Sequence, residues 1–169
     1  MAISQSTLRS KATLYTKSIW TAQEAKEIGK KTVFLCHSHR DQELVKGLIK
    51  LLAEADWEVY IDWLDETMPE KPDTETATRL KHRIRQSDGF VFLATEFSMA
   101  SRWCPWELGY ADGVKTPERV FIVPTMSRYT TYGSEYLDLY QRVEMGEGDV
   151  VGVFGPGKSK GVRISSLKL

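Results

Sequence analysis

The sequence predicts an α/β protein with a flavodoxin-like, five-stranded parallel sheet flanked by helices. Two observations support this fold class. Runs of β-branched, aromatic and other apolar residues, each of strand length, recur along the chain from residue 31 onward. Segments with apolar residues at helical spacing separate most of these runs. Strands that alternate with helices form parallel sheets, because right-handed crossovers bring each strand back in the same direction.

Three strands and two helices are expected in the first half of the sheet. The run TVFLCHS (32–38) predicts the first strand, and DQELVKGLIKLL (41–52) predicts a helix with leucines on one face. The second strand is expected at WEVYIDW (57–63) and the second helix at TATRLKHRIRQ (76–86). The continuous apolar run GFVFLAT (89–95) is typical of a strand that is buried on both faces.

The second half continues the alternation. CPWELGYADG (104–113) predicts a short helix with Pro105 at its first position and a glycine at its end, as helix termini prefer. RVFIVPT (119–125) predicts the fourth strand, SEYLDLYQRV (134–143) a helix, and DVVGVF (149–154) the fifth strand.

The chain divides into three predicted parts. Residues 1–30 are polar and predict an N-terminal helical extension, in which TAQE (21–24) is a capping-box pattern. Residues 31–156 hold the predicted sheet and helices. Residues 157–169 form a C-terminal tail.

Composition and charge narrow the class of protein. The chain has 23 basic and 23 acidic residues, so its net charge gives no support for a nucleic-acid partner or an anionic membrane. Its two cysteines, Cys36 and Cys104, have no C-x-x-C spacing, which is typical of reduced intracellular proteins. No apolar run resembles a signal peptide or a membrane helix. We therefore expect a cytoplasmic protein.

The stretch GVFGPGKS (152–159) fits the phosphate-loop pattern G-x-x-x-x-G-K-S. A phosphate loop binds nucleotides only where a strand delivers it and a helix begins at its Lys-Ser pair. The following residues, KGVRISSLKL, give no helical stripe. We therefore expect a glycine-rich turn after the last strand and no nucleotide-triphosphate site.

The predicted fold indicates two loops as the place of the functional site. In open parallel sheets, ligands bind beyond the carboxyl ends of the strands, where the strand order reverses between strands one and three. The loops at that point are CHSHRD (36–41) and EFSMASRWCPWE (96–107).

Glu107 in the second loop has two interpretations. If Pro105 is the first helical residue, Glu107 is the third and serves as the glutamate of a capping box with Cys104 as the cap. Alternatively, the helix dipole keeps Glu107 anionic at neutral pH, and the carboxylate stabilises a developing cation. Cleavage of a glycosidic bond needs such an anion, because its transition state resembles an oxocarbenium ion. Trp103 either contacts the ligand or packs against the sheet.

Other residues of the two loops also have simple structural interpretations. Asp41 can cap the first helix, Arg40 can be a solvated charge or contact a phosphate, and Ser98 and Ser101 can be turn residues. His37 and His39 lie near Cys36 at a strand end, which makes a metal site with Cys104 the alternative interpretation. We expect no metal site.

The segments VFLCHSHRD, EVYIDW, SDGFVFLATEFSMASRWCPWEL and RVFIVP resemble the successive boxes of the TIR (Toll/interleukin-1 receptor) domain family, in that order. The most specific of them is the W-C-x-x-E-L box from Trp103 to Leu108. The resemblance implies a five-stranded parallel sheet. For the enzymatic members, it also implies cleavage of NAD+ at the nicotinamide–ribose bond.

The resemblance also implies roles for individual residues. Glu107 falls on the catalytic glutamate of the family. Binding of the substrate is implied for six positions: His37, Ser38, Arg40, Trp63, Ser98 and Trp103. His39 lies in the same loop, and Trp63 begins the loop that joins neighbouring TIR domains in the family.

The resulting hypothesis is an NAD+-consuming enzyme that uses NAD+ as substrate and needs no further cofactor. It would release nicotinamide and an ADP-ribose-derived signal nucleotide, either linear or cyclic, that acts on a separate effector protein, as in the Thoeris-like antiphage systems of bacteria. Enzymatic members complete the site between two subunits, so self-association is implied. The alternative hypothesis is a non-catalytic adaptor that signals through TIR–TIR contacts, with residues 64–75 as its docking loop.

Overall fold

The computed structural model describes residues 1–15, 27, 31–55, 59–61, 73–136 and 138–167. Its centre is a parallel sheet in the order β3-β2-β4-β5-β7, in which successive neighbours run in the same direction. The five strands are β2 (Lys31–Cys36), β3 (Val59–Ile61), β4 (Gly89–Ala94), β5 (Val120–Ser127) and β7 (Gln141–Met145). Strand order 2-1-3-4-5 is the flavodoxin-like order, which confirms the predicted fold class.

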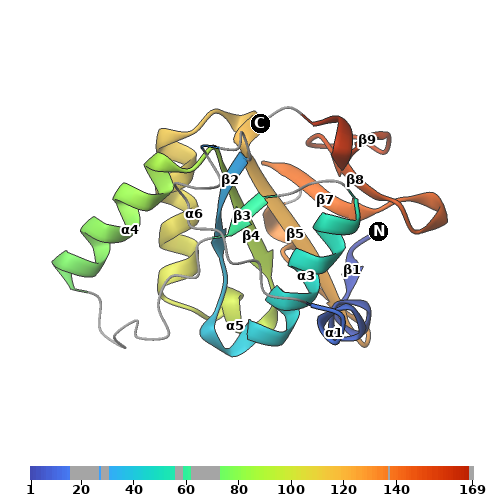
Figure 1. The fold of residues 1–169 in the computed structure, drawn as a ribbon. Helices are drawn as coiled ribbons and strands as arrows, with labels where there is room; N and C mark the ends of the chain where they lie inside the picture. Colours follow the sequence, from blue (N-terminus) through green and yellow to red (C-terminus); the bar gives the residue numbers. More distant parts are fainter. Residues whose placement is uncertain (16–26, 28–30, 56–58, 62–72, 137, 168–169) are drawn as a thin grey trace.

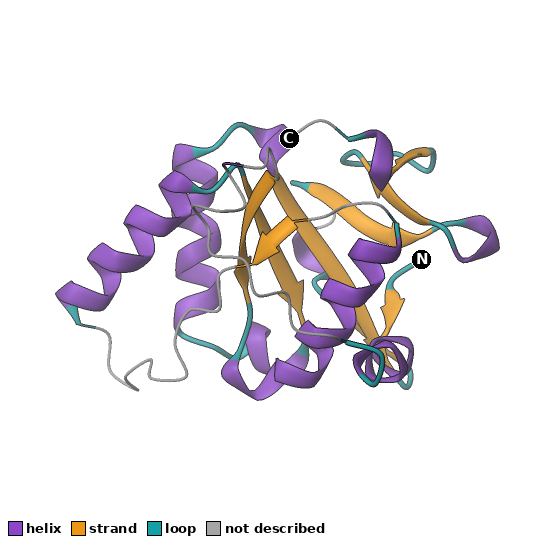
Figure 2. Ribbon diagram, in the orientation of Figure 1, coloured by secondary structure: helices purple, strands orange, loops and turns teal. Residues whose placement is uncertain are grey.

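Helices cover both faces of this sheet, and Figure 2 shows the strands between them. Helices α4 (Thr74–Gln86) and α6 (Trp103–Val114) lie on one side, and α1 (Gln5–Ala12) and α3 (Gln42–Glu54) lie on the other (Figure 1). The short helix α5 (Glu96–Met99) follows β4. Single 3-10 turns complete the helical structure at His39–Asp41, Pro117–Arg119, Ser134–Tyr136, Glu147–Asp149 and Ile164–Ser166.

The core follows the two-residue period of the strands. Val33 and Leu35 of β2 join a cluster with the leucines of α3, while Phe34 and Cys36 join a second cluster with residues of α4 and α6. Both faces of each central strand are therefore buried, as the continuous apolar runs predicted.

The predicted helix at 134–143 and the predicted fifth strand at 149–154 are wrong in part. Residues 141–145 form β7, the fifth parallel strand, which pairs with Phe121 and Ile122 of β5. The segment Val151–Phe154 is strand β8, but it runs antiparallel to β7. Tyr136, Leu139, Tyr140 and Val143 are spaced as on a helix, yet Leu139 is exposed and Val143 is fully buried in the sheet. Pairing with β5 therefore outweighed the local helical pattern.

The first residues of the chain belong to the core and not to an appended extension. Strand β1 (Ile3–Ser4) pairs in parallel with Thr125 and Met126 of β5, and α1 packs against α3. Ile3 and Leu8 are both 0% exposed. Gly47 of α3 permits this contact, because a Cβ atom there would collide with the backbone of Leu8. The capping-box pattern at 21–24 lies outside the described residues.

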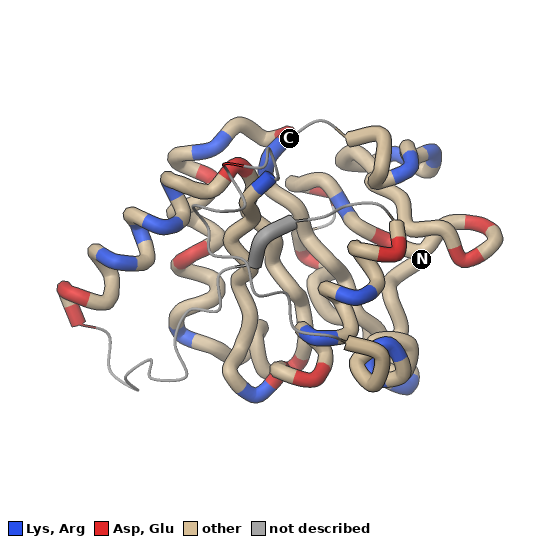
Figure 3. Tube along the Cα trace, viewed as in Figure 1, with Lys and Arg blue, Asp and Glu red and all other residues tan. Residues whose placement is uncertain are grey.

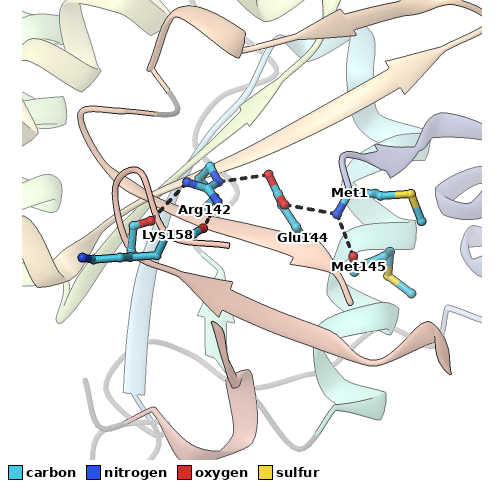
Figure 4. A network of polar contacts seen from close by, with 6 residues as sticks. Met1, Arg142, Glu144, Met145 and Lys158 are labelled. Carbon is cyan, nitrogen blue, oxygen red and sulfur yellow. Dashed lines mark hydrogen bonds and ion pairs between the residues drawn. The ribbon is translucent and has the colours of Figure 1, made fainter. Parts of the chain in front are cut away.

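The phosphate-loop pattern forms a β-turn region between two antiparallel strands, β8 and β9 (Gly161–Arg163). No helix begins at Lys158 or Ser159. The guanidinium of Arg142 donates to the carbonyl oxygens of Gly155 (3.1 Å) and Lys158 (2.7 Å), as Figure 4 shows for Lys158. The loop thus turns carbonyl oxygens toward a cation and offers no cradle of N–H groups to a phosphate. The prediction of a turn is confirmed.

Arg142 is also connected to the N-terminus, through the carboxylate of Glu144. Arg142 Nε lies 3.1 Å from a carboxylate oxygen of Glu144, and the other oxygen of Glu144 accepts from the Met1 ammonium at 3.1 Å (Figure 4). Met1 also donates to the carbonyl of Met145.

Among the helices of the described ranges, none has the length and apolar character needed to cross a bilayer.

Candidate active site

The two loops nominated from the sequence lie side by side at the carboxyl edge of the sheet. Strands β2 and β4 are neighbours in parallel register, with Cys36 beside Phe92. Beyond them, the Thr95 hydroxyl donates to the Asp41 carboxylate at 2.6 Å, and both side chains are buried. This hydrogen bond joins the loop after β2 to the loop after β4. Asp41 therefore links the loops and makes no side-chain cap of α3.

Helix α6 begins at Trp103, two residues before the position expected for its first residue. The Ser101 hydroxyl accepts from the backbone N–H groups of Trp103 (3.1 Å) and Cys104 (3.3 Å), so Ser101 satisfies two of the free donors of the first turn. Cys104 is consequently not the cap, and Glu107 is the fifth residue of the helix instead of the third. The capping-box interpretation of Glu107 is wrong.

Glu107 is buried on the inner side of α6, facing the end of β2. The residue is 5% exposed, and its carboxyl group interacts with the thiol of Cys36. Burial raises the pKa of Glu107 to about 7, and the interaction with Cys36 opposes that rise. The expectation of a carboxylate that is fully ionised at neutral pH is therefore corrected. Desolvation outweighs the helix dipole, because Glu107 lies beyond the first turn, where the dipole acts.

Aromatic rings follow Glu107 along α6. Trp103 is half-buried against the second core cluster and meets Trp106 edge to face, with ring centroids 5.6 Å apart. Trp106 is 36% exposed and stacks on Tyr110. Lys81 lies over both Trp106 and Tyr110. It belongs to the basic helix α4, where Figure 3 shows a run of lysine and arginine positions. Trp103 thus packs against the core and keeps part of its ring exposed.

The loop after β2 positions its residues by hydrogen bonds to the backbone. The ring nitrogen Nδ1 of His37 lies 2.9 Å from the Leu35 carbonyl, and burial lowers the pKa of His37, so the ring is neutral at pH 7. Ser38 is buried, and its hydroxyl accepts from the backbone N–H of Arg40. His39 and Arg40 are exposed, and the Arg40 guanidinium lies 3.7 Å from the centre of the Phe97 ring.

One of the predicted substrate-binding residues, Ser98, is not brought to the site surface. Ser98 is fully buried, and its hydroxyl donates to the Leu93 carbonyl at 2.7 Å and accepts from the Thr95 N–H at 2.8 Å. Together with Thr95 it forms the capping box of α5, a T-x-x-S spacing that sequence reasoning missed. Trp63 lies outside the described residues.

Metal binding would require a cluster of ligand side chains among the described residues. No group of three or more histidine, cysteine, aspartate or glutamate side chains is placed there to hold an ion. Cys36 and Cys104 are both free and buried. The chemistry of the site is therefore that of one buried carboxyl group beside a thiol, with partly exposed aromatic rings at its margin.

The strand order places the protein among the flavodoxin-like α/β domains, in which ligands bind in the loops beyond the carboxyl ends of the strands. The sequence model of the TIR domain matches residues 33–149, which is more than half of the chain. The protein belongs to the TIR domain family.

Two bacterial relatives share this region. A protein of Bacillus cereus (strain MSX-D12) named "Probable 3′ cyclic ADP-D-ribose synthase ThsB′" is 37% identical over 119 residues, which cover 68% of this chain and 61% of the relative. A protein of Cytobacillus dafuensis, named as a candidate cyclic ADP-D-ribose synthase TIR2, is 34% identical over 82 residues. That match covers 47% of this chain and 22% of the relative. The chain therefore matches less than two thirds of the length of either protein.

The raised pKa of Glu107 predicts an unusual dependence of stability on pH. The folded protein holds a proton up to about pH 7 that the unfolded chain loses near its ordinary value of 4.5. The free energy of unfolding should therefore fall by about 3 kcal/mol as the pH rises through this window, and Glu107→Gln should lack that fall. Urea denaturation at pH 5 and pH 8 measures the difference. Glu118→Gln, at an exposed position, is the control and should follow the wild type. Equal pH dependence in wild type and Glu107→Gln would contradict the prediction.

Proposed function

We propose that this protein is an NAD+-consuming TIR enzyme that cleaves the nicotinamide–ribose bond and releases nicotinamide and a cyclic ADP-ribose. The observation that carries the proposal is the buried Glu107 carboxyl at the switch point of the sheet, within a W-C-x-x-E-L box. The names of both bacterial relatives support the cyclic product.

Glu107 is suited to the bond-breaking step. Nicotinamide leaves as a neutral molecule, and positive charge then develops on the ribose ring. An ionised carboxylate in a site of low polarity stabilises that charge more strongly than water does, and a carboxylate can also hydrogen-bond the sugar hydroxyls. Because NAD+ carries a positive nicotinamide ring, its binding favours the ionised form of Glu107 and lowers its pKa from about 7.

The surroundings of Glu107 bear on the fate of the ribosyl cation. Burial of the carboxyl group limits the access of water, which would give linear ADP-ribose. A nucleophile from the other end of the same molecule gives a cyclic isomer instead. The half-buried Trp103 ring is at the start of α6, and the neutral His37 ring follows the end of β2. Both residues are proposed to contact the substrate.

The proposal extends to the protein's partners. Self-association through TIR–TIR contacts would complete the site, and the cyclic nucleotide would reach a separate effector protein. Arg40, Ser38 and Trp63 are proposed to bind NAD+, which serves as substrate without a further cofactor. The proposed setting is antiphage defence in the bacterial cytoplasm.

Product analysis tests the proposal directly. The purified protein is incubated with NAD+, with and without lysate from phage-infected cells, and the products are separated by liquid chromatography and identified by mass spectrometry. We expect nicotinamide and a second product with the mass of ADP-ribose minus one water. A product with the mass of ADP-ribose would make the enzyme a glycohydrolase. If no nicotinamide forms under any condition, the adaptor hypothesis replaces the enzyme.

A further inference from the structure

The loop after β2 is attached to the rest of the fold at both of its ends. At its start, the Cys36 thiol donates to the backbone carbonyl of Cys104 in α6 over 3.6 Å. At its end, the Asp41 carboxylate accepts from the Thr95 hydroxyl at 2.6 Å. The side chains that make these hydrogen bonds are buried, so water does not compete for them. Residues 37–40, which include three positions proposed to bind NAD+, lie between the two attachments.

Thr95 is a rigid partner for Asp41 because further hydrogen bonds fix it. Its hydroxyl accepts from the backbone N–H of Ser98 at 3.0 Å, and its own N–H donates to the Ser98 hydroxyl at 2.8 Å. The Ser98 hydroxyl in turn donates to the carbonyl of Leu93 in β4 at 2.7 Å. The position of Asp41 is therefore set by β4 and by the capping box of α5.

Other contacts extend this attachment into the loop. The backbone N–H of Asp41 donates to the Ser38 carbonyl at 2.8 Å, and that of Arg40 approaches the Ser38 hydroxyl at 3.4 Å. The Arg40 guanidinium lies 3.7 Å from the centre of the Phe97 ring in α5. Ser38 and Arg40 are thus connected, directly or through Asp41, to the loop after β4.

A cavity of about 160 Å³ lies at the junction of the two loops. Arg40 and Asp41 line it from the loop after β2, and Thr95 and Phe97 line it from the loop after β4. Residues of α1 and of the hairpin between β5 and β6 (Thr130–Tyr132) complete the lining. A displacement of Asp41 would therefore change a wall that Arg40 shares.

We propose that Thr95 is a positioning residue for NAD+ binding, because its hydroxyl holds Asp41 and thereby fixes the loop of residues 37–40. The inference rests on the proposed function and deepens it. Loss of the Thr95 hydroxyl would free one end of this loop and leave α6, which carries Glu107, in its place. The affinity for NAD+ should therefore fall more than the rate of bond cleavage.

Steady-state kinetics with NAD+ test the role of the hydroxyl in Thr95→Val and Thr95→Ser. Valine removes the donor, whereas serine retains it. We expect Thr95→Val to raise KM about ten- to hundredfold with kcat within about threefold of the wild type, and Thr95→Ser to keep both within about threefold. A merely structural defect would reduce the amount of active protein, which lowers the apparent kcat at unchanged KM.

Asp41→Ala separates the bridge between the loops from the cap of α5, because Thr95 can still accept from Ser98 in that variant. Asp41→Ala should raise KM as much as Thr95→Val. The double variant should raise it no further, since both substitutions remove the same hydrogen bond.

The matched control is Thr125→Val, which also removes a buried hydroxyl near the carboxyl edge of the sheet. The Thr125 hydroxyl donates to the Ala94 carbonyl and accepts from Gln5, so it has no bond to the loop after β2. KM should stay within about threefold there. Amide hydrogen exchange gives a readout that needs no NAD+: residues 37–41 should exchange faster in Thr95→Val and at the wild-type rate in Thr125→Val.

Three outcomes overturn the inference: an unchanged KM in Thr95→Val, an equal rise of KM in Thr125→Val, or unchanged exchange of residues 37–41 in Thr95→Val. Faster exchange confined to Thr95→Val, in a protein that cleaves no NAD+, would support the attachment of the loop and reject the proposed function instead. Kinetics and exchange together thus separate the two failures.

Discussion

Glu107→Gln is expected to reduce nicotinamide release from NAD+ by about 10³-fold or more, because the glutamine amide has the shape of the carboxyl group without its negative charge. The side chain is buried beside Cys36, so no solvent charge can replace it. The rate is measured as nicotinamide formed per enzyme at saturating NAD+, at pH 8, where the wild-type carboxyl is largely ionised.

The control for this prediction is Glu96→Gln, which removes an exposed carboxylate from α5 at the same edge of the sheet and should retain most of the activity. Since Glu107→Gln is expected to be at least as stable as the wild type at pH 8, unfolding cannot account for its loss. Activity of Glu107→Gln within tenfold of the wild type would show that the carboxylate does not stabilise the transition state.

Leu8→Ala is expected to lower the free energy of unfolding by about 2–5 kcal/mol, because it opens a cavity where α1 packs against α3. Leu8 is 0% exposed and lies in the core cluster with Ile3 and Val45. Chemical denaturation followed by circular dichroism measures the change.

The matched substitution is Leu14→Ala, in the residues after α1, where the side chain is 58% exposed. It should change stability by less than about 0.5 kcal/mol. If Leu8→Ala and Leu14→Ala had equal small effects, the N-terminal residues would not be docked on the sheet in solution.

The sequence was sufficient to predict the sheet wherever apolar runs were continuous. In β2 and β4, successive residues face the helices on the two sides of the sheet in turn. Both faces of each strand are therefore apolar, and the sequence shows the continuous apolar run of a buried strand. At 134–143 the local pattern favoured a helix. Residues 141–145 form a strand instead, because they pair with β5, about 20 residues earlier in the chain. The docking of Ile3 and Leu8 could not be predicted because the surrounding segment, QSTLRSKA, is polar on most of its surface.

The site was predictable in its position but not in its electrostatics. The switch point identified the two loops, and Glu107 lies there. Its protonation depends on where α6 begins and how deeply the side chain is buried. Both depend on Ser101, whose hydroxyl accepts from the first two N–H groups of the helix, and on the packing of α6 on β2. Neither the cap nor the Cys36 contact can be deduced from spacing alone.

The pairing of β1 with β5 has a consequence for synthesis of the protein on the ribosome. Ile3 pairs with Thr125, so β1 has no partner until about 120 further residues have been made. At about 5–20 residues per second, that interval is on the order of ten seconds. During this time Ile3 lacks its strand partner, whereas α3, against which Leu8 packs, is made much earlier.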